Sequence, residues 1–135
     1  MPDAALLHAA ETIDFDILVF IQPCAALIDA KFINQGMDLI INQGYDSCFA
    51  AVRESWMPVW DLDINTIGWD VNNRPRRQEM AEWYKEAGMF YITTRERLLE
   101  SKLRYSGKIG VVEIPLEDSF QVDNQQDLEL LRRLL

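Results

Sequence analysis

The sequence of 135 residues is short of several features that would assign it to a functional class. Its two cysteines, Cys24 and Cys48, are spaced for neither a zinc site nor a redox pair, which leaves them as small core residues. Its one histidine, His8, has no metal-ligating partner nearby in the sequence. No apolar run reaches the length of a membrane span, and no basic and apolar leader opens the chain. We therefore expect a cytoplasmic protein.

Basic residues are also scarce. The 13 Lys and Arg residues are outnumbered by 22 Asp and Glu residues, which gives a net charge of −9. This balance argues against nucleic acid or an anionic membrane as the main partner, and an anionic ligand would need locally placed cations or a metal ion. An apolar fraction of 49% over this length is enough for one domain, residues 1–135, with a core of its own.

The longest apolar run, Ile17–Ile21, organises the rest of the sequence. It predicts a strand buried on both faces of a parallel sheet, and Pro23 ends it. A helix capped by Asp29 and a second buried strand at Ser47–Val52 complete a predicted βαβ unit with a right-handed crossover. Because open α/β sheets bind ligands beyond the carboxyl ends of such strands, Gln22 lies at the expected position of a site.

Other segments continue the alternation of helix and strand. We expect strands at 89–92 and 109–114 and helices at 4–12 and 79–86. A capping box of Thr93 and Glu96 predicts the start of a helix that ends near Lys102. Asp123 and Gln126 form a similar pattern before the last helix, so the sequence alone favours a helix cap over a metal ligand for Asp123.

Residues 54–75 interrupt this alternation with a hairpin-like excursion. Trp56, Trp60 and Trp69 are more aromatic surface than a small hairpin buries alone, so we expect it to pack on the domain or on a second subunit. Arg74, Arg76 and Arg77 then form the only basic cluster of the chain. They are either a surface loop or a site that holds a phosphate or carboxylate through bidentate hydrogen bonds.

Several stretches together resemble the CMP-sialic acid synthetases, also called acylneuraminate cytidylyltransferases. Residues 5–11 and Asp16–Pro23 resemble that family's helix and its strand ending in Gln-Pro-Thr-Ser-Pro-Leu-Arg. Arg74–Gln78 and Tyr84–Tyr91 resemble its Arg-Arg-Gln and Tyr-Arg-Glu-Asn-Gly-Ala-Ile-Tyr stretches. Ser119–Asp127 stands where the family has Ser-x-Asp-Ile-Asp-x-x-x-Asp. Order and spacing agree along nearly the whole chain.

The resemblance implies an α/β fold, a partial Rossmann-like nucleotidyltransferase of the GT-A-like kind, with a three-layer sheet and a projecting hairpin for dimerisation. It also implies joining of CTP to an acidic nine-carbon sugar with magnesium and release of pyrophosphate. By resemblance, Arg77 and Asp123 are catalytic and Asp123 also binds Mg²⁺. Gln22, Arg76 and Gln78 match positions that bind substrate.

The departures from the family are as informative. The family's N-terminal phosphate-loop unit, with its Ile-Pro-Ala-Arg-Gly-Gly-Ser-Lys motif, has no counterpart, so we expect an N-terminally truncated relative. Gln121 replaces the first metal aspartate, which removes a negative charge from a magnesium site, and Ala87 replaces an asparagine that faces the sugar. Without the family's first strand, Ile17–Ile21 is expected to present an open apolar edge that another chain or the N-terminal helix covers. Further replacements follow Pro23 at Cys24, Ala25, Ala26 and Ile28.

Two hypotheses for function stay open. The favoured one is a cytidylyltransferase-like homodimer that is catalytically deficient alone and serves as a scaffold for a small ligand or a protein, the small ligands being CTP, a CMP-sugar or an acidic sugar. The alternative is a CMP-sugar synthetase, active in a reduced form or with a partner that supplies the phosphate loop. A thiol enzyme based on Cys24 is a poor third hypothesis, because a nucleophile needs a base within reach.

Overall fold

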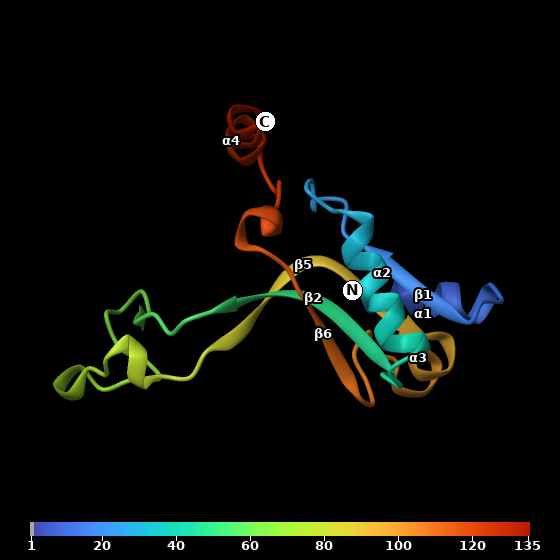
Figure 1. Cartoon of the computed structure of the whole chain (residues 1–135), viewed down its shortest axis with the longest axis horizontal. Helices are drawn as coiled ribbons and strands as arrows, with labels where there is room; N and C mark the ends of the chain where they lie inside the picture. The colour runs from blue at the N-terminus through green and yellow to red at the C-terminus, as the bar shows by residue number, and fades with distance from the viewer. Residues whose placement is uncertain (1) are drawn as a thin grey trace. The chain divides into compact units, whose positions relative to one another are not determined.

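The computed structural model describes residues 2–135 as two compact units. The core unit consists of residues 2–52 and 86–135, and the excursion unit, Arg53–Lys85, is inserted between these two parts of the chain. Strand β2 (Ser47–Glu54) leads into the excursion unit, and strand β5 (Trp83–Thr94) leads out of it (Figure 1). The core unit is therefore built from two segments of the chain that are separated in sequence by the excursion unit.

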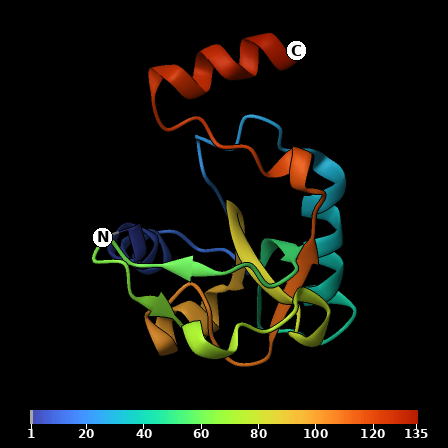
Figure 2. The same cartoon turned by 90° about the vertical axis from the view of Figure 1, so that its left-hand side faces the viewer.

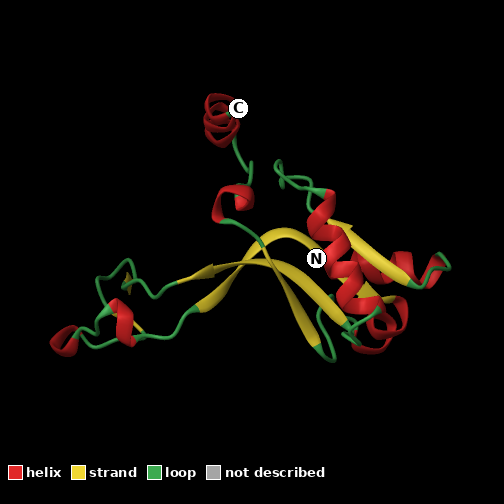
Figure 3. Ribbon diagram, viewed as in Figure 1, coloured by secondary structure: helices red, strands yellow, loops and turns green. Residues whose placement is uncertain are grey.

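A mixed sheet of four strands in the order β1-β5-β2-β6 forms the centre of the core unit (Figure 3). Strand β1 (Ile17–Ile21) pairs with β5 in antiparallel orientation, with Val19 opposite Ile92. Strand β6 (Ile109–Glu113) pairs with β2 in parallel orientation. The sheet confirms the predicted α/β class and contains the four predicted strands, of which β5 is much longer than the predicted 89–92, but the predicted neighbours are wrong.

The prediction that Ile17–Ile21 is an inner strand of a parallel sheet is wrong. Strand β1 is an edge strand with mostly half-buried side chains, and β5 separates it from β2, so the two strands of the predicted βαβ unit are not neighbours. The N–H of Gln22 donates to the carbonyl of Met89, and the N–H of Arg95 donates to the carbonyl of Asp16. Hydrogen-bonded and non-hydrogen-bonded residues alternate in an antiparallel pair. The intervening odd-numbered residues of β1 therefore direct their backbone groups to the outer edge, which has no strand partner within residues 2–135.

Helix α2 (Ala30–Ile41) covers one face of the sheet. The predicted cap is confirmed, because the Asp29 carboxylate accepts a hydrogen bond of 2.8 Å from the Lys31 N–H. The apolar face of α2 packs into the main core, whose fully buried members include Phe90 and Ile92 of β5. Burial of apolar surface contributes about 25 cal/mol per Å² to the free energy of unfolding, so the packing of α2 on the sheet stabilises the core unit.

Helices α1 (Pro2–Thr12) and α3 (Arg95–Ser101) pack on each other at the opposite face. The helices bury Leu6, Ala10 and Leu98 against Leu18 and Phe20 of β1. The alternate residues of β1, Ile17 and Val19, pack into the main core on the α2 side. Helices therefore cover both faces, which confirms the predicted three-layer arrangement.

Two further predictions fail at element ends. The cap of α3 is Thr94 rather than Thr93, because Thr93 is fully buried as part of β5, opposite Leu18. The helix predicted at 79–86 is absent, since a 3-10 turn at Arg77–Glu79 is followed by the start of β5 at Trp83. The remaining elements of the described chain are β3 (Val59–Trp60), β4 (Thr66–Ile67), 3-10 turns at Val71–Asn73 and Leu116–Ser119, and α4 (Gln125–Leu134).

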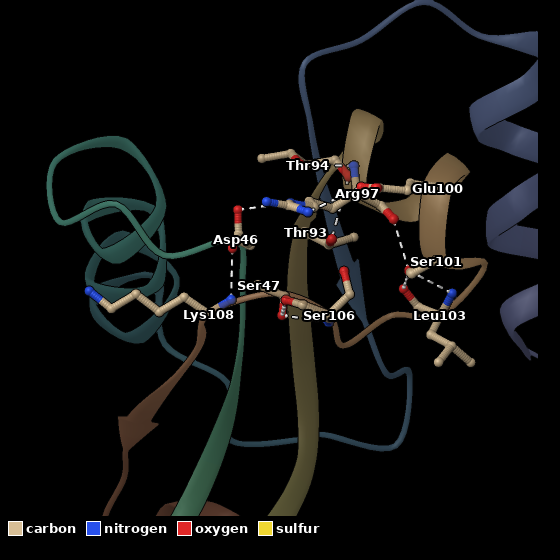
Figure 4. Close-up of polar contacts among 10 residues, drawn as sticks. All are labelled: Asp46, Ser47, Thr93, Thr94, Arg97, Glu100, Ser101, Leu103, Ser106 and Lys108. Atoms are coloured by element: carbon tan, nitrogen blue, oxygen red, sulfur yellow. Dashed lines mark hydrogen bonds and ion pairs between the residues drawn. The ribbon is translucent and has the colours of Figure 1, made fainter.

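A polar cluster centred on Asp46 fixes the end of the sheet where β2 and β6 begin (Figure 4). Its carboxylate accepts hydrogen bonds from the Arg97 guanidinium at 2.9 Å and from the Lys108 backbone N–H at 2.7 Å. The Ser47 hydroxyl donates to the carbonyl of Ser106 at 2.9 Å. These contacts join α3 and the loop before β6 to the start of β2.

The excursion unit contains a two-stranded antiparallel hairpin of β3 and β4. The Trp69 indole N–H donates to the carbonyl of Val59 at 3.0 Å, and its ring meets that of Trp60 edge-on at 5.0 Å between centroids. The Asp61 carboxylate accepts the backbone N–H groups of Asp63 and Asn65 and so forms the turn. A hairpin is therefore found within residues 54–75, as predicted, and its paired strands are two residues long. Within residues 2–135, no helix has the length and apolar character needed to cross a bilayer.

Candidate functional site

The turn after β1 is the first part of the candidate site. Gln22, predicted from its place at the end of the strand, is half-buried, and its N–H donates to the carbonyl of Met89 at 2.9 Å. Its own carbonyl accepts the N–H of Ala25, which is itself buried. The strand end and the following turn are therefore fixed by backbone hydrogen bonds, which leaves the Gln22 side chain available for a ligand.

The segment that precedes α4 lies beside this turn (Figure 2). The N–H of Val122 donates to the carbonyl of Cys24 at 2.9 Å. The side-chain amide of Gln121 donates to the carbonyl of Ala87, at the beginning of the core-unit part of β5, with a distance of 2.6 Å. Three segments far apart in the sequence thus meet at one end of the sheet.

Asp123 follows directly in this segment and is exposed. Its N–H donates to the Asp127 carboxylate at 3.0 Å, but the cap of α4 is Asn124, whose side chain accepts the Asp127 N–H. The capping box predicted for Asp123 and Gln126 is therefore shifted by one residue to Asn124 and Asp127. Since Asp123 is not used as the cap, its carboxylate remains available to a ligand.

The donor set around Asp123 provides little for a divalent cation. Among residues 2–135, no three His, Cys, Asp or Glu side chains lie close enough together to hold a metal ion. The Asp127 carboxylate accepts the N–H groups of Asp123 and Asn124, and the Gln121 amide nitrogen is bonded to Ala87. One free carboxylate does not form an all-protein cage for Mg²⁺, which usually takes one or two carboxylates together with the phosphates of a substrate. Magnesium at Asp123 stays a prediction.

The basic cluster lies in the excursion unit, where it lines a cavity of about 420 Å³. Arg76 makes a long ion pair of 4.0 Å with Glu79, and both side chains are largely exposed. The side chains of Arg74 and Arg77 have no ion-pair or hydrogen-bond partner among the described residues, so their guanidinium donors are available to an anion. The cavity is lined by Trp56, Met57, Pro58, Arg74, Pro75, Arg76, Arg77 and Gln78.

The predicted site residues therefore fall in two groups. Gln22 and Asp123 belong to the core unit, where the contact between Val122 and Cys24 brings their segments together. Arg76, Arg77 and Gln78 belong to the excursion unit and share its cavity. Each group is defined within its own unit.

Sequence reasoning missed the contact between Gln121 and Ala87. It identified both positions as separate departures from the family: Ala87 replaces an asparagine and so loses an amide, and Gln121 replaces an aspartate and so gains one. In the structure the gained amide of Gln121 binds the backbone at Ala87. A pair of complementary changes was the signal that would have indicated contact.

The two thiols differ from what a thiol enzyme needs. Burial raises the pKa of Cys48 to about 12, and its thiol donates to the carbonyl of Gly36 at 3.6 Å, so it stays protonated and structural. Cys24 is half-buried in the turn after β1, while His8 lies on α1. No hydrogen bond joins these two side chains in the described chain.

Comparison with known proteins adds the following. No family model matches the chain. It is 31% identical over 116 residues to N-acylneuraminate cytidylyltransferase A of Danio rerio and 30% identical to cytidylyltransferase B of the same fish. These matches cover 82% of this chain, which spans only 27% of the length of either relative. In fold it is similar to 4-diphosphocytidyl-2C-methyl-D-erythritol synthase of Anaerococcus prevotii, with a TM-score of 0.68 at 7% identity, over 99% of this chain and 66% of that one.

Proposed function

From the premise that this chain is a relative of the N-acylneuraminate cytidylyltransferases, we propose that it binds an acidic sugar or its cytidine nucleotide and does not complete cytidylyl transfer by itself. The observation that carries the proposal is the hydrogen bond from the Gln121 amide to the Ala87 carbonyl. It commits to the backbone a position where the resemblance places a metal-binding carboxylate. Asp123 is then the one carboxylate left for Mg²⁺.

Binding of an anion is supported by the cavity of the excursion unit. The chain carries a net charge of −9, so an anionic ligand needs cations placed at the site itself. Arg74 and Arg77 line the cavity with unpaired guanidinium groups, and Gln78 adds an amide. A planar guanidinium matches the two oxygens of a carboxylate, the group that distinguishes an acidic sugar from a neutral one.

Calorimetry and a pyrophosphate assay test the proposal together. We expect the full chain to bind N-acetylneuraminate, CMP or CTP, and to release no pyrophosphate from CTP and N-acetylneuraminate in the presence of Mg²⁺. Replacement of Arg77 by Ala should weaken binding of the acidic sugar by about 10- to 100-fold, the range for a hydrogen bond to a charged group. Arg132→Ala, an exposed arginine near the end of α4, is the matched control. Absence of binding to all three compounds would reject the proposal.

The second candidate is a CMP-sugar synthetase, in a reduced form or together with a partner chain. The identity of 31% to an N-acylneuraminate cytidylyltransferase favours it. Arg77 and Asp123 would then be catalytic, and bound Mg²⁺ would supply charge compensation to the nucleotide phosphates. Pyrophosphate release that requires Mg²⁺ and is lost in Asp123→Asn would establish this function in place of the first.

We also propose that the excursion unit associates with a second copy of the chain. Trp60, Leu62, Ile64 and Ile67 are between 43% and 101% exposed on this small unit. Monomeric proteins rarely leave so many large apolar side chains together in solvent. A symmetric dimer would cover the same residues on both copies.

A further inference from the structure

The end of the sheet that holds Gln22 is joined by contacts from three parts of the chain. Gln22 donates to Met89 through its backbone N–H, and Val122 donates to Cys24 in the same way. The third contact, from Gln121 to Ala87, is the only one of the three made by a side chain. Its strength therefore depends on residue type, whereas the other two depend only on the backbone.

Gly88 leaves the space that the Gln121 amide occupies. Gly88 has a φ of +60°, a left-handed backbone conformation that residues with a side chain rarely adopt. A Cβ atom at this position would collide with the Nε2 atom of Gln121. The absence of a side chain at Gly88 is what lets the amide reach the carbonyl of Ala87, a residue that is itself buried.

A carboxylate at position 121 would not make this contact. An ionised carboxylate only accepts hydrogen bonds, so it has no proton to offer the Ala87 carbonyl and would bring negative charge against it. The half-buried Gln121 uses its amide N–H for the protein, and its amide oxygen is neutral, whereas Mg²⁺ prefers the anionic oxygen of a carboxylate. The interaction that the structure shows at this position is a structural hydrogen bond, and the charge that a carboxylate would offer a metal ion is absent.

We infer that Gln121 is a positioning residue, which joins the 121–123 segment to β5 so that the ligand surface beside Gln22 is organised without a divalent cation. The inference rests on the proposed binding function. The proposed function concerns which ligand binds, and the role of Gln121 concerns what holds the surface beside Gln22 in place. Its consequence is that ligand affinity depends on the Gln121 amide and not on Mg²⁺.

Calorimetry with N-acetylneuraminate, CMP and CTP, each in EDTA and in Mg²⁺, tests the inference in the full chain. For the ligand that binds, we expect wild-type affinity to agree within about twofold in the two buffers. Gln121→Leu, of similar size but with no donor, should weaken binding by about three- to tenfold in both buffers. Gln126→Leu, an exposed glutamine of α4, is the control and should bind as wild type. Unchanged affinity of Gln121→Leu, or a wild-type affinity that rises more than tenfold with Mg²⁺, would overturn the inference.

A second measurement separates this inference from the proposed function. If none of the three ligands binds, the proposed function fails, but the contact can still be tested by urea unfolding of Gly88→Ala, Gln121→Ala and the double variant. We expect Gly88→Ala to lower the unfolding midpoint less in the Gln121→Ala background, because the added methyl group then meets no amide. We also expect the Val122 amide to exchange faster in Gln121→Ala, as its segment loosens. Additive midpoint shifts with unchanged exchange would refute the positioning role.

Discussion

The core unit and the excursion unit bury their apolar residues very differently. In the core unit, Phe90, Met89, Ile92 and Leu98 are at most 1% exposed. In the excursion unit, which the structure describes in full, Trp56 is the only buried residue. A four-stranded sheet between helices provides an interior for apolar side chains, and a hairpin with strands of two residues does not.

This difference indicates that the core unit provides most of the stability of the fold, while the excursion unit presents side chains that can interact with other molecules. The core unit has buried enough apolar surface to be stabilised by its own contacts. The excursion unit is organised by turns and by edge-on tryptophan pairs, and it keeps its apolar and basic side chains accessible. All four tryptophans of the chain lie in the excursion unit, so tryptophan emission reports on that unit while far-UV circular dichroism reports mainly on the core unit.

The largest expected effect is the loss of one core aromatic ring. Phe90→Ala should lower the free energy of unfolding by about 3–5 kcal/mol, because the ring is fully buried and leaves a cavity. Trp60→Ala removes a larger ring that is 43% exposed, and should cost about 1 kcal/mol, the scale of an aromatic pair. Urea unfolding measures the first cost by circular dichroism and the second by emission of the three remaining tryptophans. Equal costs would show that the two units are stabilised in the same way.

The next effect concerns the proposed association. Leu62→Glu places a charge on a fully exposed apolar residue of the excursion unit and should weaken dimerisation by about 100-fold, which corresponds to about 2.7 kcal/mol. Leu116→Glu makes the same change at an exposed leucine of the core unit and should leave association unaffected. Light scattering across a dilution series measures the oligomeric state. A wild-type chain that is monomeric at every concentration would contradict the proposed dimer.

A smaller effect is expected for two tyrosine hydroxyls. Tyr105 donates to Glu86 at 2.8 Å and its ring meets those of Phe49 and Tyr91 edge-on, so Tyr105→Phe should cost about 1 kcal/mol. In the excursion unit, Tyr84 is 46% exposed and its hydroxyl accepts from Arg53, so Tyr84→Phe should cost less than about 0.5 kcal/mol. Thermal melts of the two variants measure the difference. A larger loss in Tyr84→Phe would reverse the comparison.

The smallest effect appears only in acid. The Lys108 backbone N–H and then the Arg97 guanidinium lower the pKa of Asp46, and the Asn65 backbone and side chain do the same for the pKa of Asp61. A lowered pKa stabilises the folded state above about pH 4, and this contribution is lost as the pH falls through the folded value.

Melting curves between pH 7 and pH 3 test this titration. Asp46→Asn should flatten the acid decline of the circular dichroism transition, and Asp61→Asn that of the tryptophan transition. An unchanged decline in both variants would show that other carboxylates govern it.

The bounds of most elements follow from local signals. The apolar runs at β1, β2 and β6 and the Asp29 cap were visible in sequence because each depends on a few adjacent residues. The neighbours of β1 were not visible, because β5 enters the sheet between β1 and β2 from more than 60 residues away and leaves no periodic trace near Ile17. Trp83–Lys85 was mistaken for helix because its residues are exposed and lack the alternation of a buried strand.

For the candidate site, residue types were predictable and contacts were not. Gln22 was found from its place after a strand, and the basic cluster was found from its contrast with an acidic chain. The bond from Gln121 to Ala87 depends on the left-handed backbone of Gly88 and on a separation of 34 residues. Neither of these is encoded by spacing or composition.

Gly36 is a buried residue of α2 that faces strands β2 and β5. A methyl group there would be 2.6 Å from Cδ1 of Ile92 and 3.2 Å from the sulfur of Cys48. A larger residue there requires the Ile92 side chain or the helix to shift, and α2 begins a few residues after the turn that contains Gln22. Substitution at this one glycine is thus a way to shift α2 against the sheet while leaving the sequence of the turn itself untouched.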